Sequence, residues 1–180
     1  GFENYDILPD LFTTAKGLSG GLPQSALVGR RELMDIYAPN TMTSTHSGSP
    51  VASAGTAANI KFLKEHNMCQ EALRKGKIME EKLKALWKQF PERISYVSGI
   101  GMAWAVTFAE ADTHAIHPEF ALEVTKKCNE NGLTFFAAVG AGITMKLTPP
   151  LTIPDDALIE GLEAYATAVA EADAIMPAYK

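Results

Sequence analysis

Residues 11–23 read Leu11-Phe-Thr-Thr-Ala-Lys16-Gly17-Leu-Ser-Gly-Gly-Leu-Pro23, a short β-prone run followed by a glycine-rich loop. The run predicts a strand that stops at Gly17, and the glycines predict a backbone that bends sharply or approaches something closely. Lys16 therefore stands at the carboxyl edge of a strand, where α/β sheets bind ligands. A partly buried lysine amine is nucleophilic toward carbonyl groups. By itself, however, Lys16 fits a solvated loop lysine better.

The sequence on the C-terminal side of this loop predicts a second short strand over 25–29, a helical turn over 30–36 and a polar loop over 41–49. Ser49-Pro50 then supplies an N-cap followed by proline at the first helical position. The helix that begins there runs to about residue 66 and is rich in alanine. Such small residues allow a helix to pack very close to a neighbour.

The remaining chain alternates helical and strand patterns. It predicts a helix over 69–90, a Gly-interrupted strand over 94–108, a helix over 118–131, strands over 133–139 and 143–147, and a last helix to about 174. Thr152-x-x-Asp155 resembles a capping box at the start of the last helix. In the first of these helices, the Lys/Glu run from Glu71 to Lys88 predicts a solvent-facing side.

The composition changes near residue 68, which predicts a domain boundary. Residues 68–180 look like a complete α+β layer. Two strands and one helix within 1–67 cannot enclose a core, so this part is expected to belong to a larger sheet. The chain also starts without Met, a hint of a piece cut from something longer. Several apolar side chains are then expected to lie exposed: Leu8, Leu11, Phe12, Leu27 and Val28.

Composition excludes several classes of function. The net charge of −5 and pI near 5.4 argue against nucleic-acid binding, which relies on Lys and Arg. No apolar run approaches the roughly 20 residues of a membrane helix. Two cysteines are too few for a disulfide scaffold, so we expect a cytoplasmic protein. Gly99-x-Gly101 lacks the third glycine of a dinucleotide fingerprint, and the zinc-like spacing His114-x-x-His117 has no evident third ligand.

Four segments, in order, resemble characteristic segments of class III aminotransferases. The family has a Pro-Asp stretch leading into a strand that ends in Ala/Gly-Lys-Gly, followed by a glycine loop ending in Leu-Pro. It also has Thr-aromatic-Gly-Gly-Asn-Pro-Val-Ala, Val-Arg-Gly-x-Gly-Leu and Arg-x-x-Pro-Pro-Leu segments. The corresponding stretches here lie at 6–26, at Thr45-His-Ser-Gly-Ser-Pro-Val-Ala, at Val97-Ser-Gly-Ile-Gly-Met, and at Lys146-Leu-Thr-Pro-Pro-Leu-Thr.

The resemblance implies a fold type I pyridoxal phosphate enzyme of α/β class. Residues 1–67 would be the C-terminal part of its large pyridoxal phosphate-binding domain, and residues 68–180 its small C-terminal α+β domain. Lys16 would hold the cofactor as an internal aldimine and then shuttle a proton. Thr45 would donate a hydrogen bond to the cofactor phosphate from the neighbouring subunit, so the resemblance also implies a homodimer with shared active sites.

The implied activity is transfer of an amino group from an amine or amino acid to a 2-oxo acid. In many relatives the Arg of Arg-x-x-Pro-Pro-Leu binds the substrate carboxylate. Lys146 replaces it here, and it either binds that carboxylate differently, as a point charge, or is structural. Ser98 and His46 are further departures from the family pattern. An aminomutase of the same family is an alternative. Another is a non-catalytic fragment, because the family's remaining cofactor contacts lie upstream of the lysine and match nothing in this chain.

Overall fold

The computed structural model describes residues 1–109, 116, 118–134, 136 and 143–177. The chain divides into two compact units, Gly1–Asn67 and Met68–Lys180. Each unit is described by itself below. The strand expected over 133–139 falls largely outside the described residues, as do His114, His117 and the glycine pair at 140–142. Among the helices that the structure describes, none combines the length and the apolar character that crossing a membrane requires.

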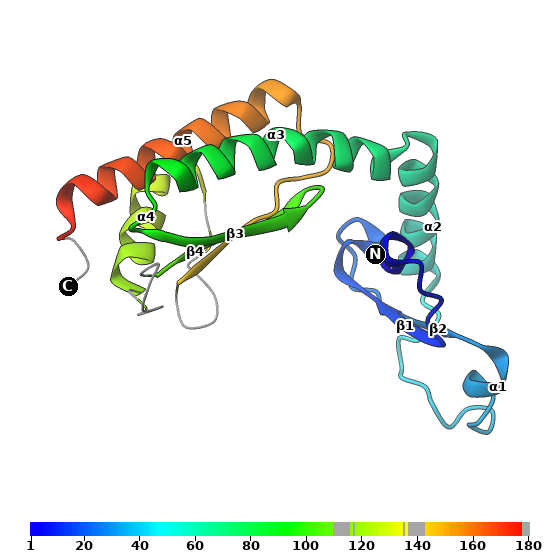
Figure 1. The fold of residues 1–180 in the computed structure, drawn as a ribbon. Coiled ribbons are helices and arrows are strands. Elements are labelled where there is room, and N and C mark those ends of the chain that lie inside the picture. Colours follow the sequence, from blue (N-terminus) through cyan, green and yellow to red (C-terminus); the bar gives the residue numbers. More distant parts are fainter. Residues whose placement is uncertain (110–115, 117, 135, 137–142, 178–180) are drawn as a thin grey trace. The chain divides into compact units, whose positions relative to one another are not determined.

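The first unit consists of a two-stranded sheet, one long helix and short helical turns, drawn from blue to cyan in Figure 1. The two strands pair antiparallel, with Leu11 opposite Gly29 and Thr14 opposite Ala26. The short 3-10 turn that follows the first strand packs against the long helix. In order, the elements are η1 (Phe2–Tyr5), β1 (Leu11–Thr14), η2 (Lys16–Ser19), β2 (Ala26–Gly29), α1 (Arg31–Met34) and α2 (Pro50–Glu65).

This first unit has almost no core of its own. Among its described residues, Ala52 is the single buried hydrophobic side chain. Leu8 is 81% exposed, and the other four apolar side chains expected to be exposed are so as well, namely Leu11, Phe12, Leu27 and Val28. That expectation is confirmed. Four-residue strands that are open on both faces cannot bury enough apolar area to hold a unit together.

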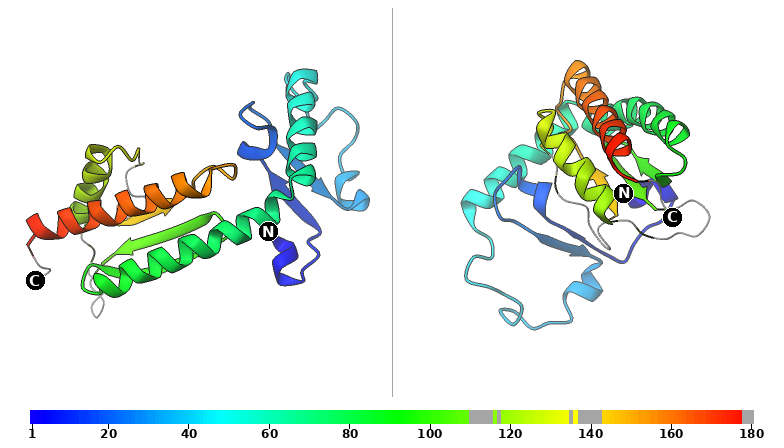
Figure 2. Two further views of the ribbon diagram at one scale, coloured as in Figure 1. Left: turned by 90° about the horizontal axis from the view of Figure 1, so that it is seen from above. Right: turned by 90° about the vertical axis from the view of Figure 1, so that its left-hand side faces the viewer.

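The second unit is a three-stranded antiparallel sheet packed against three helices. The strand order is β3-β4-β5, and buried side chains alternate along β4 with more exposed ones, as expected for a sheet with one covered face. Figure 2 gives two further views of this unit. Its elements are α3 (Met68–Gln89), β3 (Ile94–Ile100), β4 (Ala103–Phe108), α4 (Pro118–Glu130), β5 (Thr144–Leu147) and α5 (Asp155–Ile175).

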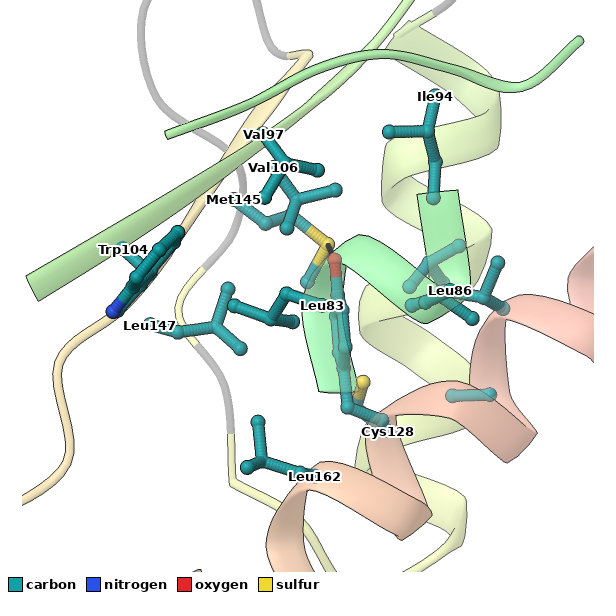
Figure 3. Packing of buried hydrophobic residues seen from close by; sticks show 14 of the residues in the cluster. Leu83, Leu86, Ile94, Val97, Trp104, Val106, Cys128, Met145, Leu147 and Leu162 are labelled. Atoms are coloured by element: carbon teal, nitrogen blue, oxygen red, sulfur yellow. Dashed lines mark hydrogen bonds between the residues drawn. The ribbon is translucent and has the colours of Figure 1, made fainter. Parts of the chain in front are cut away.

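A single hydrophobic core joins all of these elements. Tyr165, Phe108 and Phe120 are its largest fully buried side chains. Figure 3 shows how the helices and strands supply side chains to the same interior, Leu83 from α3, Cys128 from α4, Leu162 from α5, and Val106 and Met145 from neighbouring strands. The α+β layer expected for this part of the chain is therefore present.

The Gly-interrupted strand expected over 94–108 is instead a hairpin. β3 and β4 pair with each other, Ile100 opposite Ala103, so the connection is the two residues Gly101-Met102. Gly101 has φ +56°, a conformation that side chains disfavour and that tight hairpin turns require. The alternation of apolar residues was read correctly, but it continues through a reversal of chain direction, which periodicity alone does not show.

Neither of the two predicted side-chain caps forms. Ser49 is the N-cap residue of α2, as predicted, but its side chain makes no capping hydrogen bond. The capping box Thr152-x-x-Asp155 does not form, because the N-cap of α5 is Pro154 and Asp155 is the first helical residue. Thr152 therefore lies two residues before the N-cap, where its hydroxyl cannot take the capping role.

Candidate functional site

Lys16 lies at the junction between β1 and the 3-10 turn η2. Ala15, the N-cap of that turn, is extended with φ −160° and ψ −165°, whereas Lys16 itself has φ +54°. A non-glycine residue with positive φ is uncommon and often marks a functional position. The side chain is exposed, and no hydrogen bond or ion pair within the described ranges occupies its amine. The structure therefore presents a free primary amine on a conformationally constrained residue.

The glycine loop after Lys16 is held by short internal contacts. The Leu18 N–H donates to the Ala15 carbonyl at 3.1 Å, closing a turn around Lys16 and Gly17. The buried Ser19 hydroxyl donates to the Leu22 carbonyl. Gly20 and Gly21 follow with φ of +69° and +125°. The loop therefore uses its glycines as the sequence predicts, at positions whose backbone other residues would strain.

Helix α2 supports this turn from the side, through a residue that sequence reasoning missed. Asn59 Nδ2 donates to the Gly17 carbonyl at 2.8 Å and to the Leu18 carbonyl at 3.0 Å. A Cβ on Gly55 would lie 2.8 Å from Leu22 Cδ1, so the loop packs directly against the helix at this glycine. The alanine-rich pattern predicted close packing of this helix. The available signal was a lone Asn among small residues, one turn beyond that glycine.

Thr45 lies in the polar loop before α2. This loop is built from turns, with the Ser47 N–H donating to the Ser44 carbonyl at 3.0 Å and the Ser49 N–H to the His46 carbonyl at 3.2 Å. Thr45 is exposed, and its hydroxyl makes no hydrogen bond within the part of the chain that the structure describes. No contact of that kind joins Thr45 to Lys16, so the structure does not bring these two predicted site residues together within one chain.

Lys146 belongs to the second unit, on the edge strand β5 opposite Ala105. Its neighbours Met145 and Leu147 are buried and Lys146 is exposed, so its side chain lies on the face of the sheet away from the core. Lys146 also contributes to the lining of a cavity of about 350 Å³ whose other walls are mostly apolar, including Leu133 and Ile153.

The segment after Lys146 is held by the side chain of Lys75, which was expected to be solvent-exposed. The sequence pattern puts Lys75 on the solvent-facing side of α3, but the residue is only 6% exposed. Its Nζ donates to the Leu151 carbonyl at 3.0 Å and to the Ile153 carbonyl at 2.6 Å. Its aliphatic stem is covered and its charge is satisfied by two carbonyl oxygens. The assignment of Lys75 to the solvent face was wrong, because the loop folds back over that part of the helix.

A neighbouring ion pair fastens the start of α5. Arg74 donates to both carboxylate oxygens of Asp155, at 2.8 and 2.7 Å, and also to Glu71. The hydrogen bond from Arg74 lowers the pKa of the Asp155 carboxyl below its usual value. Bidentate Arg–carboxylate pairs carry more geometric specificity than single contacts. Lys75 and Arg74 therefore hold consecutive parts of the chain that follows Lys146.

Comparison with known proteins matches this arrangement to one family. A sequence model of the family described as "Aminotransferase class-III" matches residues 1–169. The "Probable 4-aminobutyrate aminotransferase" of Bacillus subtilis (strain 168) is 33% identical over 161 residues, 89% of this chain and 37% of that protein. The "Leucine/methionine racemase" of Thermococcus litoralis is 33% identical over 172 residues, 95% of this chain and 38% of that protein.

The solved structures that resemble this chain are also transaminases. An S-selective transaminase from an Arthrobacter species, with alanine bound, has a TM-score of 0.82 at 26% identity, over 94% of this chain and 40% of that one. An acetylornithine aminotransferase from Elizabethkingia anophelis has a TM-score of 0.83 at 24% identity and shows the shared fold. The chain spans under two fifths of the length of the B. subtilis and T. litoralis relatives. Its fold is that of part of a fold type I transaminase, and the chain belongs to the class III aminotransferase family.

Proposed function

We propose that the protein carrying this chain is a pyridoxal phosphate-dependent aminotransferase that moves an amino group from an amine or amino acid to a 2-oxo acid. The observation that carries the proposal is the Lys16 amine. It is exposed and unpartnered within the described ranges, and it stands on a positive-φ residue at the end of β1. The surrounding segment lies within the family match.

The residues present fit the cofactor. A covalent site for an aldehyde needs a free primary amine, which Lys16 supplies. The site also needs room, and a Cβ placed on Gly17 or Gly21 would meet nothing within 4 Å. Thr45 offers a hydroxyl that the described residues leave free to donate to a phosphate. When bound, pyridoxal phosphate supplies an electron sink for negative charge that develops at the substrate Cα.

Within this proposal each residue of the chain has a stated task. Lys16 Nζ would hold the cofactor, and the same amine would take a proton from the substrate Cα or return it. Lys146 binds the substrate carboxylate with its exposed ammonium. Its single point charge orients a carboxylate less strictly than the planar fork of an arginine.

The proposal extends to assembly and organisation. Thr45 does not meet Lys16 within the chain, which supports a homodimer in which Thr45 serves the partner's cofactor. Because residues 1–67 lack a core, we assign them to the C-terminal part of the large cofactor-binding domain. Residues 68–180 have their own core and are assigned to the small domain. Both cysteines are free thiols, in keeping with a reducing, cytoplasmic location.

A second candidate activity is amino-acid racemisation. It is favoured by the match to the leucine/methionine racemase, which covers 95% of this chain. The same lysine chemistry would serve both reactions, since each begins with proton removal from Cα. The two activities separate cleanly in an assay: an aminotransferase converts a supplied 2-oxo acid into a new amino acid, whereas a racemase inverts the donor without an acceptor.

The test uses the complete encoded polypeptide and the variant Lys16→Ala. We expect the parent to be yellow with pyridoxal phosphate, and borohydride to fix the cofactor on the peptide containing Lys16. Lys16→Ala should lose both the fixed cofactor and turnover. Lys61→Ala is the matched control, because Lys61 is an exposed lysine of the same unit that pairs only with Glu65 among the described residues. Appreciable turnover by a folded Lys16→Ala protein would exclude Lys16 as the catalytic residue.

A further inference from the structure

Asn59 makes the side-chain contact between α2 and the turn that carries Lys16. It lies near the middle of α2, 42 residues from Gly17 in sequence. Its Nδ2 donates to two consecutive carbonyls, those of Gly17 and Leu18. The opposite side of its amide faces Gly20, where a Cβ would stand 3.6 Å from Oδ1. The half-buried Asn59 side chain therefore contacts the loop that follows Lys16 through both its nitrogen and its oxygen.

The backbone of Lys16 needs such support. Its φ of +54° is disfavoured for residues that carry a Cβ, and such conformations persist only where the surroundings enforce them. One restraint is local, the hydrogen bond from the Leu18 N–H to the Ala15 carbonyl. A Cβ on Gly17 would meet nothing within 4 Å, so packing around Gly17 adds no further restraint. Within the described ranges, the side-chain hydrogen bonds that reach this turn from outside come from the Asn59 amide.

We propose that Asn59 is a positioning residue for Lys16: its amide fixes the Gly17 and Leu18 carbonyls and thereby keeps the Lys16 amine in the orientation in which it binds the cofactor. This inference rests on the proposed function for the identity of the bound group. It assigns to a helix residue outside the lysine loop the task of preorganising that loop. Asn59 touches neither substrate nor cofactor in this role.

Loss of the amide should loosen the turn without unfolding the unit. Gly17 is exposed and Leu18 is half-buried, so water can replace Asn59 at both carbonyls. Alanine is a better helix former than asparagine, so α2 should persist in Asn59→Ala. The effect is then confined to the orientation of Lys16 and to the dynamics of the 15–22 segment.

The experiment compares Asn59→Ala and Asn59→Asp with the parent, in the complete encoded polypeptide. Asn59→Asp keeps the size and shape of the side chain but removes its N–H donors and sets a carboxylate against two carbonyl oxygens. Asn129→Ala is the matched control, because Asn129 Nδ2 also donates to a backbone carbonyl, that of Thr125 within its own helix. It lies in the other unit and should behave as the parent does.

Two measurements are made, one without cofactor and one with it. In the cofactor-free protein, hydrogen exchange at the Leu18 amide should accelerate on the order of tenfold in both Asn59 variants, while α2 amides keep their protection. With cofactor, the dissociation constant of pyridoxal phosphate should rise on the order of tenfold, since two neutral hydrogen bonds are together worth about that factor. The rate of borohydride fixation at Lys16 should fall in parallel.

Parent-like exchange and cofactor affinity in Asn59→Asp would overturn the inference, because the isosteric variant lacks both hydrogen bonds and adds a carboxylate that the two carbonyls repel. Faster exchange with unchanged cofactor affinity would also overturn it, leaving Asn59 a merely structural residue. A parent protein that fixes no cofactor at Lys16 would instead contradict the proposed function, which is read from the parent alone. The two failures are therefore distinguishable.

Discussion

Replacing Gly76 by alanine tests how α3 packs against the β3–β4 turn. A Cβ on Gly76 would lie 2.6 Å from the Gly101 carbonyl oxygen, 2.7 Å from its Cα and 2.9 Å from its carbonyl carbon. All three are backbone atoms, and that turn is held further by the Trp104 indole N–H, which donates to the Gly101 carbonyl at 2.9 Å. Neither side can give way by rotating a side chain.

Helix propensity alone predicts that Gly76→Ala raises the unfolding free energy, whereas the close packing predicts that it lowers it. In an unhindered helix, Gly→Ala stabilises by about 1 kcal/mol. Ordinary contact begins near 3.4 Å, so α3 would have to retreat by about 0.8 Å at Gly76. Overpacking of this kind costs about 1–3 kcal/mol, and a clash with three backbone atoms belongs at the upper end. We expect Gly76→Ala to lower the unfolding free energy by a net of about 2 kcal/mol.

Gly161→Ala is the control, because it makes the same chemical change in α5 with room to spare. Its Cβ would lie 3.7 Å from Leu133 Cδ1, an ordinary contact. This variant should therefore gain about 1 kcal/mol. For a unit that spans Met68–Lys180, 1 kcal/mol corresponds to roughly 4 °C in the melting temperature, so the two variants should move in opposite directions by measurable amounts.

Thermal and urea unfolding followed by tryptophan fluorescence is the assay, since Trp87 and Trp104 both lie in the second unit. Trp104 is 6% exposed and touches the same turn, so it reports on the perturbed region. If Gly76→Ala proved as stable as the parent, or more stable, the close approach of α3 to Gly101 would be refuted. A loss of stability in Gly161→Ala would refute the reasoning from propensity.

Three further predictions concern single side chains. Lys146→Met should raise KM for carboxylate substrates by about tenfold to a hundredfold and barely change simple amines; equal effects on both would make Lys146 structural. Burial raises the pKa of the Cys128 thiol to about 12, so the folded chain should react with a thiol reagent at the exposed Cys69 alone, and two fast thiols would contradict this. Asp155, whose pKa Arg74 lowers, contributes stability above the unfolded carboxyl pKa of about 3.9, and this is lost as the pH falls through the lower folded value. Asp155→Asn should accordingly flatten the acid limb of melting temperature against pH, and an unchanged limb would refute the role of the pair.

Much of this protein follows from local sequence. Three- and four-residue spacing of apolar side chains predicts α3, and Pro118 and Gly132 bound α4, each to within a residue or two of its ends. The strand predicted to stop at Gly17 is shorter, because β1 ends at Thr14 and Lys16 already belongs to the 3-10 turn. The Ala-Lys-Gly segment, with three others, indicated the family that comparison then established. These features are local because helical period, turn residues and strand ends depend on neighbours within a few positions.

Tertiary structure decided which side chains support the predicted ones. Asn59 reaches Gly17 across 42 residues, and Lys75 reaches Leu151 and Ile153 across 76 and 78. No local pattern shows which segment these polar residues contact, because their partners are backbone carbonyls, which every residue has. The turn at Gly101 is also invisible in the local pattern, because the alternation of apolar residues continues from β3 through the turn into β4. The sequence determined the helices and singled out Lys16, but it did not show the reversal at Gly101. The packing of distant segments decided that Asn59 contacts the turn after Lys16, because a hydrogen bond to the main chain leaves no mark in the partner's residue type.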